Sequence, residues 1–268
     1  MTGPDPDTAA QPPSADLPDG PAQQPPLLSM HGMTKRYGAV EALVDVDLVV
    51  RQHEVVALVG DNGAGTSTLA KMISGVLAPD AGLIEMSGVP VTIPSASAAN
   101  AMGVATVFQD LALCDNLDVT ANLFLGRELR SGRARDDGAM EEIARRTLRD
   151  LNSRIPSVRA PLRTLSAGQR QSVAIARTLI GSPRLVVLDE PTAALSVAQT
   201  AEVLNHIERL RDLGLGVVLI SHNMNDVRAV ADRIEVLRHG RNNGSFDAAT
   251  ASYEQVLGAI TGARLSSF

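Results

Sequence analysis

A glycine-rich loop near residue 60 has the residue types and spacing of a phosphate-binding site. The apolar run 55–59 predicts a buried strand before the loop, and the residues behind it predict the opening of a helix. Glycines let backbone N–H groups approach an anion, and the positive end of the helix dipole lies beside them. The loop fits the pattern G-x-x-x-x-G-K-[ST] at Gly60, Gly65 and Ser67. Thr66 stands where a lysine would reach the β- and γ-phosphates.

Two carboxylates and a histidine follow buried strands farther along the chain. The apolar run 185–188 ends in Asp189 and Glu190. Because neighbouring strand residues point to opposite faces, we expect separate functions for them. Asp189 suits the surroundings of a Mg²⁺ ion, and Glu190 suits a base that polarises a water molecule. His222 follows another buried strand at 216–220 and could contact a γ-phosphate. The alternatives are two charges that cap a strand and a structural histidine.

Three further side chains could contact a nucleotide or a metal ion. Gln109 directly follows the predicted strand 104–108 and could ligate a metal or a water; otherwise it is a polar residue entering a loop. Ser166 is a good N-cap for a helix that continues over 172–180, and the start of that helix is a second anion site. Tyr37 could stack on an adenine base, or it is a half-buried strand aromatic.

Apolar periodicity predicts the elements that position these groups. Strands are expected at 27–30, 40–50, 83–86, 91–93, 104–108, 185–188, 216–220, 229–237 and 240–246. Helices are expected at 136–152, at 172–180 behind the Ser166 cap, at 197–213 behind Ser196, and at 253–260. The charges of 136–152 indicate a solvated helix face and no nucleic-acid site.

In order and spacing, these motifs together resemble an ATP-binding cassette (ABC) transporter ATPase over residues 27–246. Residues 165–169 (LSAGQ) resemble the family's L-S-G-G-Q signature, with Ala167 in place of a glycine. The segments 108–113, 122–128 and 193–197 resemble the ATPases of bacterial monosaccharide importers. A Rossmann dehydrogenase is the alternative, but the loop lacks its third glycine at the required spacing.

The resemblance implies a role for each matching residue. It implies ATP binding by Tyr37, Gly60, Asp61, Asn62, Gly63, Ala64, Gly65, Thr66, Ser67, Thr68, Ser166, Gly168 and Gln169. It implies Mg²⁺ binding by Ser67, Gln109 and Asp189, and catalysis by Glu190, His222 and Gln109.

The resemblance also implies an α/β fold: a P-loop NTPase core with a mostly parallel sheet, an antiparallel β subdomain, and a helical signature subdomain at about 110–180. We expect a disordered, Pro-rich tail at 1–26, the ATP-binding domain at 27–250, and a C-terminal helix and tail at 251–268.

The family resemblance implies partners as well. One cassette per chain implies a head-to-tail homodimer or a heterodimer with another cassette. The resemblance further implies transmembrane permease subunits, contacted by residues 110–119, and a substrate-binding protein. Because Thr66 occupies the position of the lysine, two hypotheses stay open: a slow importer ATPase, or a hydrolysis-impaired regulatory cassette. Lys71 does not replace the missing lysine, because it lies five residues on, about 7.5 Å along the helix axis.

Composition excludes several other classes of protein. The 268 residues are 44% hydrophobic and carry a formal charge of −6, which argues against a general affinity for nucleic acid. The single cysteine, Cys114, excludes an intramolecular disulfide and fits a reducing compartment. Neither a signal peptide nor an apolar run of membrane-spanning length is recognisable. We therefore expect a cytoplasmic protein that reaches the inner face of the membrane through its permease.

Overall fold

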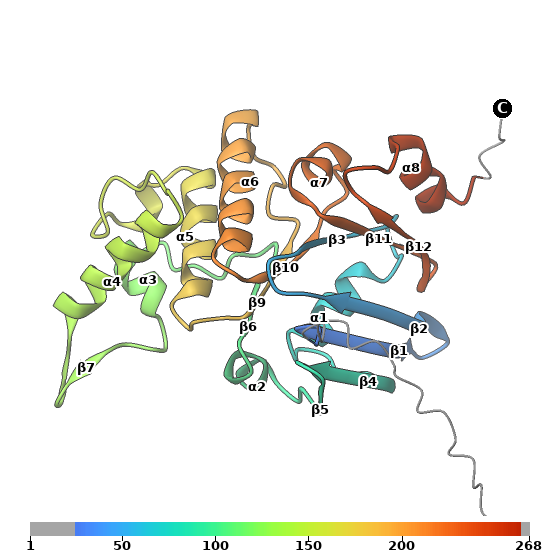
Figure 1. Ribbon diagram of the computed structural model, residues 1–268. Coiled ribbons are helices and arrows are strands. Elements are labelled where there is room, and N and C mark those ends of the chain that lie inside the picture. The colour runs from blue at the N-terminus through green and yellow to red at the C-terminus, as the bar shows by residue number, and fades with distance from the viewer. Residues whose placement is uncertain (1–24, 264–268) are drawn as a thin grey trace, which may run out of the picture.

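A six-stranded sheet forms the centre of the computed structural model, which describes residues 25–263 (Figure 1). The strand order is β12-β11-β3-β10-β9-β6. Their bounds are β3 Val55–Val59, β6 Val104–Val107, β9 Leu185–Asp189, β10 Gly216–Ile220, β11 Arg233–Arg238 and β12 Arg241–Asp247. All neighbours are parallel except β11 and β12. The central strands are buried on both faces, which explains their unbroken apolar sequences.

A second, antiparallel sheet has the order β2-β1-β4-β5. Its strands are β1 Leu28–Tyr37, β2 Val40–Val50, β4 Ala81–Met86 and β5 Val89–Val91. Met30, Leu48 and Ile84 lie on its buried side and pack with residues of the central sheet and α1 (Thr66–Ile73) in one apolar core.

The remaining helices flank the central sheet, and α3, α4 and α5 among them lie on the side away from β1 and β2 (Figure 1). They are α2 Ala96–Ala101, α3 Val119–Phe124, α4 Asp137–Asp150, α5 Ala167–Leu179, α6 Val197–Asp212, α7 Met224–Val230 and α8 Tyr253–Thr261. A short hairpin of β7 (Arg130–Ser131) and β8 (Ala134–Arg135) projects beyond α4, and a 3₁₀ turn spans Leu162–Thr164. In the described residues, no helix is both long and apolar enough to cross a membrane.

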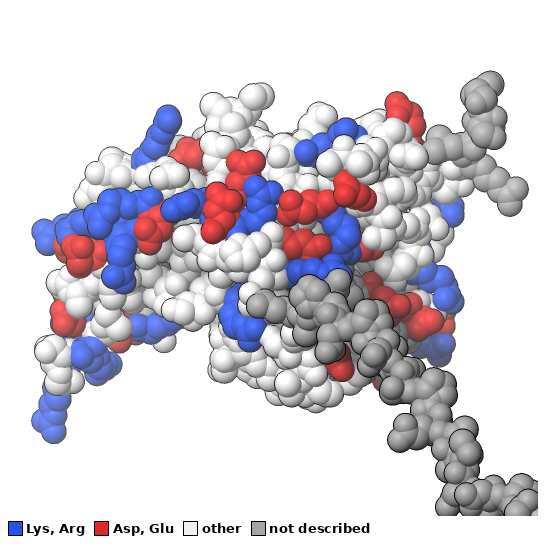
Figure 2. Space-filling model, viewed as in Figure 1, with Lys and Arg blue, Asp and Glu red and all other residues white. Residues whose placement is uncertain are grey.

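The exposed face of α4 carries ion pairs, as its sequence predicts. Glu141 accepts hydrogen bonds from Arg159 at 2.6 Å and from Arg145 at 2.7 Å. The hydrogen bond from Arg159 is the main cause that holds the pKa of Glu141 below its ordinary value. Figure 2 shows acidic and basic side chains interspersed over the viewed face.

Several sequence-based boundaries are corrected by the structure. The predicted strand 229–237 is wrong at its start, because residues up to Val230 belong to α7 and β11 begins only at Arg233. The strand predicted at 91–93 lies earlier, as β5, and β1 runs seven residues beyond its predicted end at Met30. The helices α4, α5, α6 and α8 are confirmed. Of the predicted disordered tail, residues 1–24 lie outside the described residues.

Candidate functional site

The loop between β3 and α1 has glycines where no other residue fits. A Cβ on Gly60 would lie 2.5 Å from the carbonyl oxygen of Leu237. Gly65 has φ +107°, and its Cβ would lie 2.8 Å from the carbonyl oxygen of Ala42. Backbone bonds fix the loop: the Ala64 N–H donates to Asp61 O at 2.9 Å, and the Gly240 N–H donates to Ala64 O at 3.0 Å. Close backbone packing therefore holds the loop in one conformation.

The same loop presents unpaired N–H groups at the start of α1. The Leu69 N–H donates to Gly65 O at 3.0 Å and is the first helical bond. The backbone N–H groups of residues 66–68 find no acceptor in the part of the chain that the structure describes. Gly65 is the N-cap and supplies no side-chain acceptor. This helix end therefore has both the free donors and the dipole that an anion requires.

The positive charge of Lys71 acts on Asp189 at the end of β9. Burial raises the pKa of the Asp189 carboxyl above its ordinary value, the neighbouring Glu190 raises it further, and the positive charge of Lys71 opposes both. Thr66 lies partly exposed in the first turn of α1. That Lys71 does not replace a lysine at position 66 stays a prediction from the sequence.

Glu190 and His222 meet at the carboxyl edge of the central sheet. His222 Nδ1 lies 2.9 Å from Glu190 Oε2, and the two residues follow the adjacent parallel strands β9 and β10. Glu190 has φ +51° and donates its N–H to the Ile220 carbonyl at 2.9 Å. The chain has therefore left β9 at Glu190, and strand alternation does not separate it from Asp189. The turn at Glu190 separates the two carboxylates instead, so the argument from strand alternation is wrong.

A second contact, which the sequence does not predict, joins the turn after β9 to the segment after β10. Thr192 Oγ1 donates to Asp226 Oδ2 at 2.7 Å. Asp226 is 6% exposed and lies in the first turn of α7. Since α7 begins just after His222, recognition of this helix would have placed Asp226 in its first turn, close to that histidine. The turn that carries Glu190 is thus held to the His222 segment at two points.

The residues that resemble the signature sequence, 165–169, form the start of α5. Ser166 and Gln169 form a capping box: the Gln169 N–H donates to Ser166 Oγ at 3.2 Å, and the Ser166 N–H donates to Gln169 Oε1 at 3.0 Å. A Cβ on Gly168 would lie 2.8 Å from Cγ of Gln199 in α6. Ala167 has no positive φ, so it substitutes for glycine without backbone strain. Within the described residues, no hydrogen bond or ion pair joins 165–169 to the phosphate loop.

Gln109 and Tyr37 lie at the margins of the site. Gln109 is exposed and follows β6, which pairs with β9 so that Val107 is opposite Leu188. Gln109 and Asp189 therefore leave neighbouring strands at the same edge of the sheet. Tyr37 ends β1 and is 49% exposed, with Lys35 Nζ 6.0 Å from the centre of its ring.

Comparisons with known proteins agree with this geometry. The family model described as ABC transporter matches residues 43–193. The chain is 41% identical to the fructose import ATP-binding protein FrcA of Rhizobium meliloti, over 90% of this chain and 96% of that protein. It is 43% identical to the xylose/arabinose import ATP-binding protein XylG of Sulfolobus acidocaldarius, over 80% of this chain and 86% of that protein.

Solved structures share the fold. The ADP conformation of MJ1267, an ATP-binding cassette of an ABC transporter, matches with a TM-score of 0.75 at 23% identity, over 89% of this chain and 96% of that one. The bacterial ABC transporter cassette MJ0796, a dimeric structure, matches with a TM-score of 0.70 at 24% identity, over 82% and 98%. The expected P-loop core with its mostly parallel sheet is confirmed, and the chain belongs to the ABC transporter family as an ATP-binding cassette and P-loop ATPase.

Proposed function

We propose that this chain is the ATP-binding subunit of a sugar importer and couples ATP binding and hydrolysis to transport through a separate membrane permease. The observation that carries the proposal is the Glu190–His222 pair at 2.9 Å, on the same sheet edge as the phosphate loop. Glu190 has φ +51°, a conformation that is uncommon for a residue other than glycine. The printed names of the relatives, fructose import and xylose/arabinose import proteins, favour a monosaccharide as the cargo.

ATP binding is proposed at the loop of residues 60–68, with the adenine base on the exposed face of Tyr37. The free N–H groups at the start of α1 would hold the β-phosphate. Mg²⁺ would bind to Ser67, Gln109 and Asp189, whose hydroxyl, amide and carboxylate oxygens fit a hard cation. The described residues contain no cluster of three His, Cys, Asp or Glu side chains. This fits an ion that takes most of its ligands from phosphate and water.

In hydrolysis, Glu190 would accept a proton from the attacking water, and His222 would orient Glu190 and contact the γ-phosphate. Ser166, Gly168 and Gln169 would close over nucleotide held by a second cassette, in a homodimer or a heterodimer. The dimeric structure of the cassette MJ0796, which shares this fold, supports a role across an interface. The permease would hold the cassette at the inner face of the membrane, and a substrate-binding protein would deliver the sugar.

One observation favours a second function. Thr66 is short and neutral, and the sequence predicts that Lys71 does not replace a lysine there. Hydrolysis should therefore be slower than with a lysine at position 66, because that cation stabilises charge that grows toward the transition state. In the extreme case, the chain is a regulatory cassette that binds nucleotide without useful turnover.

Deleting the gene in its source organism and measuring uptake of labelled fructose, ribose, xylose and arabinose tests the proposal. Uptake of at least one sugar should fall and should be restored by the parent chain but not by Glu190→Gln. Restoration by Glu190→Gln would favour the regulatory function. Unchanged uptake of every sugar would contradict the proposed cargo class.

A further inference from the structure

A buried histidine that the proposed mechanism does not use lies between α5 and α6. The two helices pack side by side (Figure 1). His206 of α6 is 1% exposed, and its Nε2 lies 2.9 Å from Oγ of Ser172, a fully buried residue of α5. Ser172 Oγ also donates to the carbonyl oxygen of Gly168, one turn earlier in α5, at 3.1 Å. Two linked hydrogen bonds therefore lead from α6 to the residues that resemble the signature sequence.

The positions of the protons follow from these contacts. The carbonyl oxygen of Gly168 can only accept, so the single hydroxyl proton of Ser172 goes to it. The contact with His206 is then a hydrogen bond only if Nε2 carries a proton and donates to Ser172 Oγ. Burial lowers the pKa of His206, and the charge of Glu202 opposes that effect only in part, so the imidazole is neutral at about pH 7. His206 therefore acts on α5 as a neutral donor through Nε2.

The stability of the core does not require this polar pair. Val173, next to Ser172, and Ile207, next to His206, are buried in one apolar core. Replacing both partners of a buried hydrogen bond with apolar groups of the same shape is nearly neutral or stabilising. Hydrogen bonds differ from such apolar contacts in having a preferred direction. The pair therefore adds a fixed geometry to the contact between α5 and α6.

That geometry concerns the first turn of α5. A serine hydroxyl that donates to the carbonyl four residues earlier often bends a helix. By donating to Ser172 Oγ, His206 holds the hydroxyl in the orientation that reaches Gly168. Gln199, in the first turn of α6, also packs against Gly168, where a Cβ would lie 2.8 Å from Gln199 Cγ. Two residues of α6 therefore act on Gly168, His206 through Ser172 and Gln199 directly.

We propose that His206 is a positioning residue, which through Ser172 fixes the first turn of α5 in the orientation that closes over the nucleotide of a second cassette. The closure itself rests on the proposed function. The N–H groups of Ala167 and Gly168 have no acceptor among the described residues and lie at the positive end of the helix dipole. These donors and the Ser166 hydroxyl move together when the first turn changes direction. His206 thereby sets where they point.

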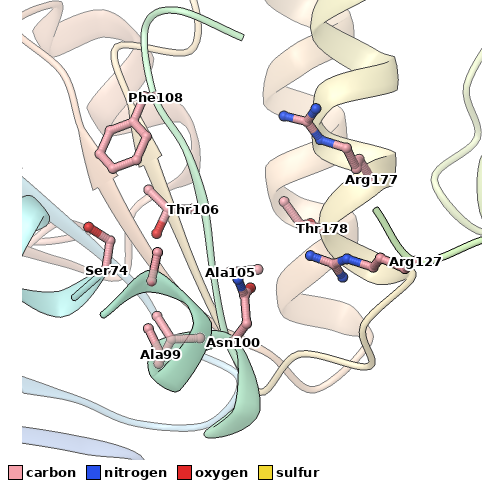
Figure 3. Close-up of a pocket in the computed structure, with 11 residues that line it drawn as sticks. Ser74, Ala99, Asn100, Ala105, Thr106, Phe108, Arg127, Arg177 and Thr178 are labelled. Carbon is pink, nitrogen blue, oxygen red and sulfur yellow. The ribbon is translucent and has the colours of Figure 1, made fainter. Parts of the chain in front are cut away.

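Four variants separate positioning from packing. His206→Leu removes the donor and keeps an apolar side chain of similar size, whereas His206→Gln keeps an N–H donor. Ser172→Ala leaves the His206 N–H buried without an acceptor, and the double variant Ser172→Ala/His206→Leu removes both partners. Thr178→Val is the matched control, because Thr178 Oγ1 donates to the carbonyl of Ile175 at 2.6 Å near the other end of α5, beside a separate pocket (Figure 3).

Amide hydrogen exchange of the full chain without nucleotide measures the first turn of α5 directly. The amides of residues 169–172 should exchange about two- to tenfold faster in His206→Leu and in the double variant, the range that corresponds to one lost hydrogen bond. In His206→Gln and Thr178→Val, these amides should exchange at the rate of the parent. Equal exchange in the parent and in His206→Leu would overturn the inference.

Phosphate release and Mg-ATP titration test the effect on the reaction. His206→Leu should lower kcat with little change in affinity for Mg-ATP, and His206→Gln should retain the kcat of the parent. The double variant should melt above Ser172→Ala, because no buried N–H is left unpaired, but its kcat should stay low. Recovery of kcat together with the melting temperature would show a merely structural role and overturn the inference. A parent that releases no phosphate would refute hydrolysis in the proposed function, whereas the exchange result would still decide whether His206 positions α5.

Discussion

Thr66→Lys would place a cation in the first turn of α1, beside N–H groups of residues 66–68 that have no acceptor in the described chain. The charge of Lys71, which lies one turn farther along α1, acts on Asp189. Threonine and lysine both fit a first helical turn, so the fold should tolerate the change. The substitution therefore isolates the effect of one positive charge on phosphate binding.

The magnitude follows from the number of hydrogen bonds gained. A charge-assisted bond from lysine to a phosphate oxygen contributes about 1.5–3 kcal/mol, and about 1.4 kcal/mol is tenfold in affinity. Thr66 is partly exposed, which favours the lower end of that range. We expect Mg-ATP to bind roughly tenfold more tightly to Thr66→Lys. The rate of hydrolysis should rise by more than the affinity, because the lysine acts on charge that develops in the transition state.

The assay pairs calorimetric titration of Mg-ATP with phosphate release, on purified parent and Thr66→Lys. Thr66→Ser is the matched control, because it keeps a short neutral hydroxyl side chain and should change neither quantity much. Unchanged binding and turnover in the lysine variant would refute the assignment of this loop to phosphate. Tighter binding without faster turnover would favour the regulatory function.

Three further predictions concern stability and catalytic geometry. Gly168→Ala should destabilise the fold by about 1–3 kcal/mol in urea denaturation, because the new Cβ would crowd Gln199; an unchanged midpoint would contradict that packing. Asp226→Ala and Thr192→Val should each lower kcat with little change in ATP affinity, because each removes the hydrogen bond between Thr192 and Asp226. The kcat of the double variant should be little lower than that of either single variant, since only one bond is lost. Additive losses of kcat would show that this bond is not their shared cause. Asp189→Asn should melt above the parent without nucleotide at about pH 7, because burial raises the folded pKa of Asp189 and its charged form is unfavourable. The gain in melting temperature should shrink as the pH falls through the raised pKa of Asp189. A gain in melting temperature that grows instead would refute the effect of burial on this carboxyl.

Local signals explain why the elements that carry the candidate site were largely predictable. The capping boxes of α5 and α6 are encoded within four residues, at Ser166 and Ser196. Buried parallel strands have continuous apolar sequences, and parallel order brings their carboxyl ends together. β3, β10 and β9 are adjacent and parallel, so the phosphate loop, Glu190 and His222 lie at one edge of the sheet.

Features that depend on distant contacts were not predictable. α7 has only seven residues, and its Val230 joins the short apolar run that was interpreted as a strand. α2 is rich in alanine with a single buried residue, Ala99, so it lacks a helical apolar stripe. The hydrogen bond between Thr192 and Asp226 joins residues 34 positions apart. Those from the Arg177 guanidinium to the carbonyls of Ala112 and Leu111 join residues 65 and 66 positions apart. Nothing in the local sequence indicates such pairs.

Phosphate release from Mg-ATP by the purified chain, compared with Glu190→Gln, tests most directly that this edge of the sheet is an ATPase site. Glutamine keeps the shape of Glu190 and its distance from His222 but cannot accept a proton. We predict that the parent hydrolyses ATP measurably, and that Glu190→Gln binds Mg-ATP with the affinity of the parent but releases no phosphate above background. Equal phosphate release from both proteins would contradict the account.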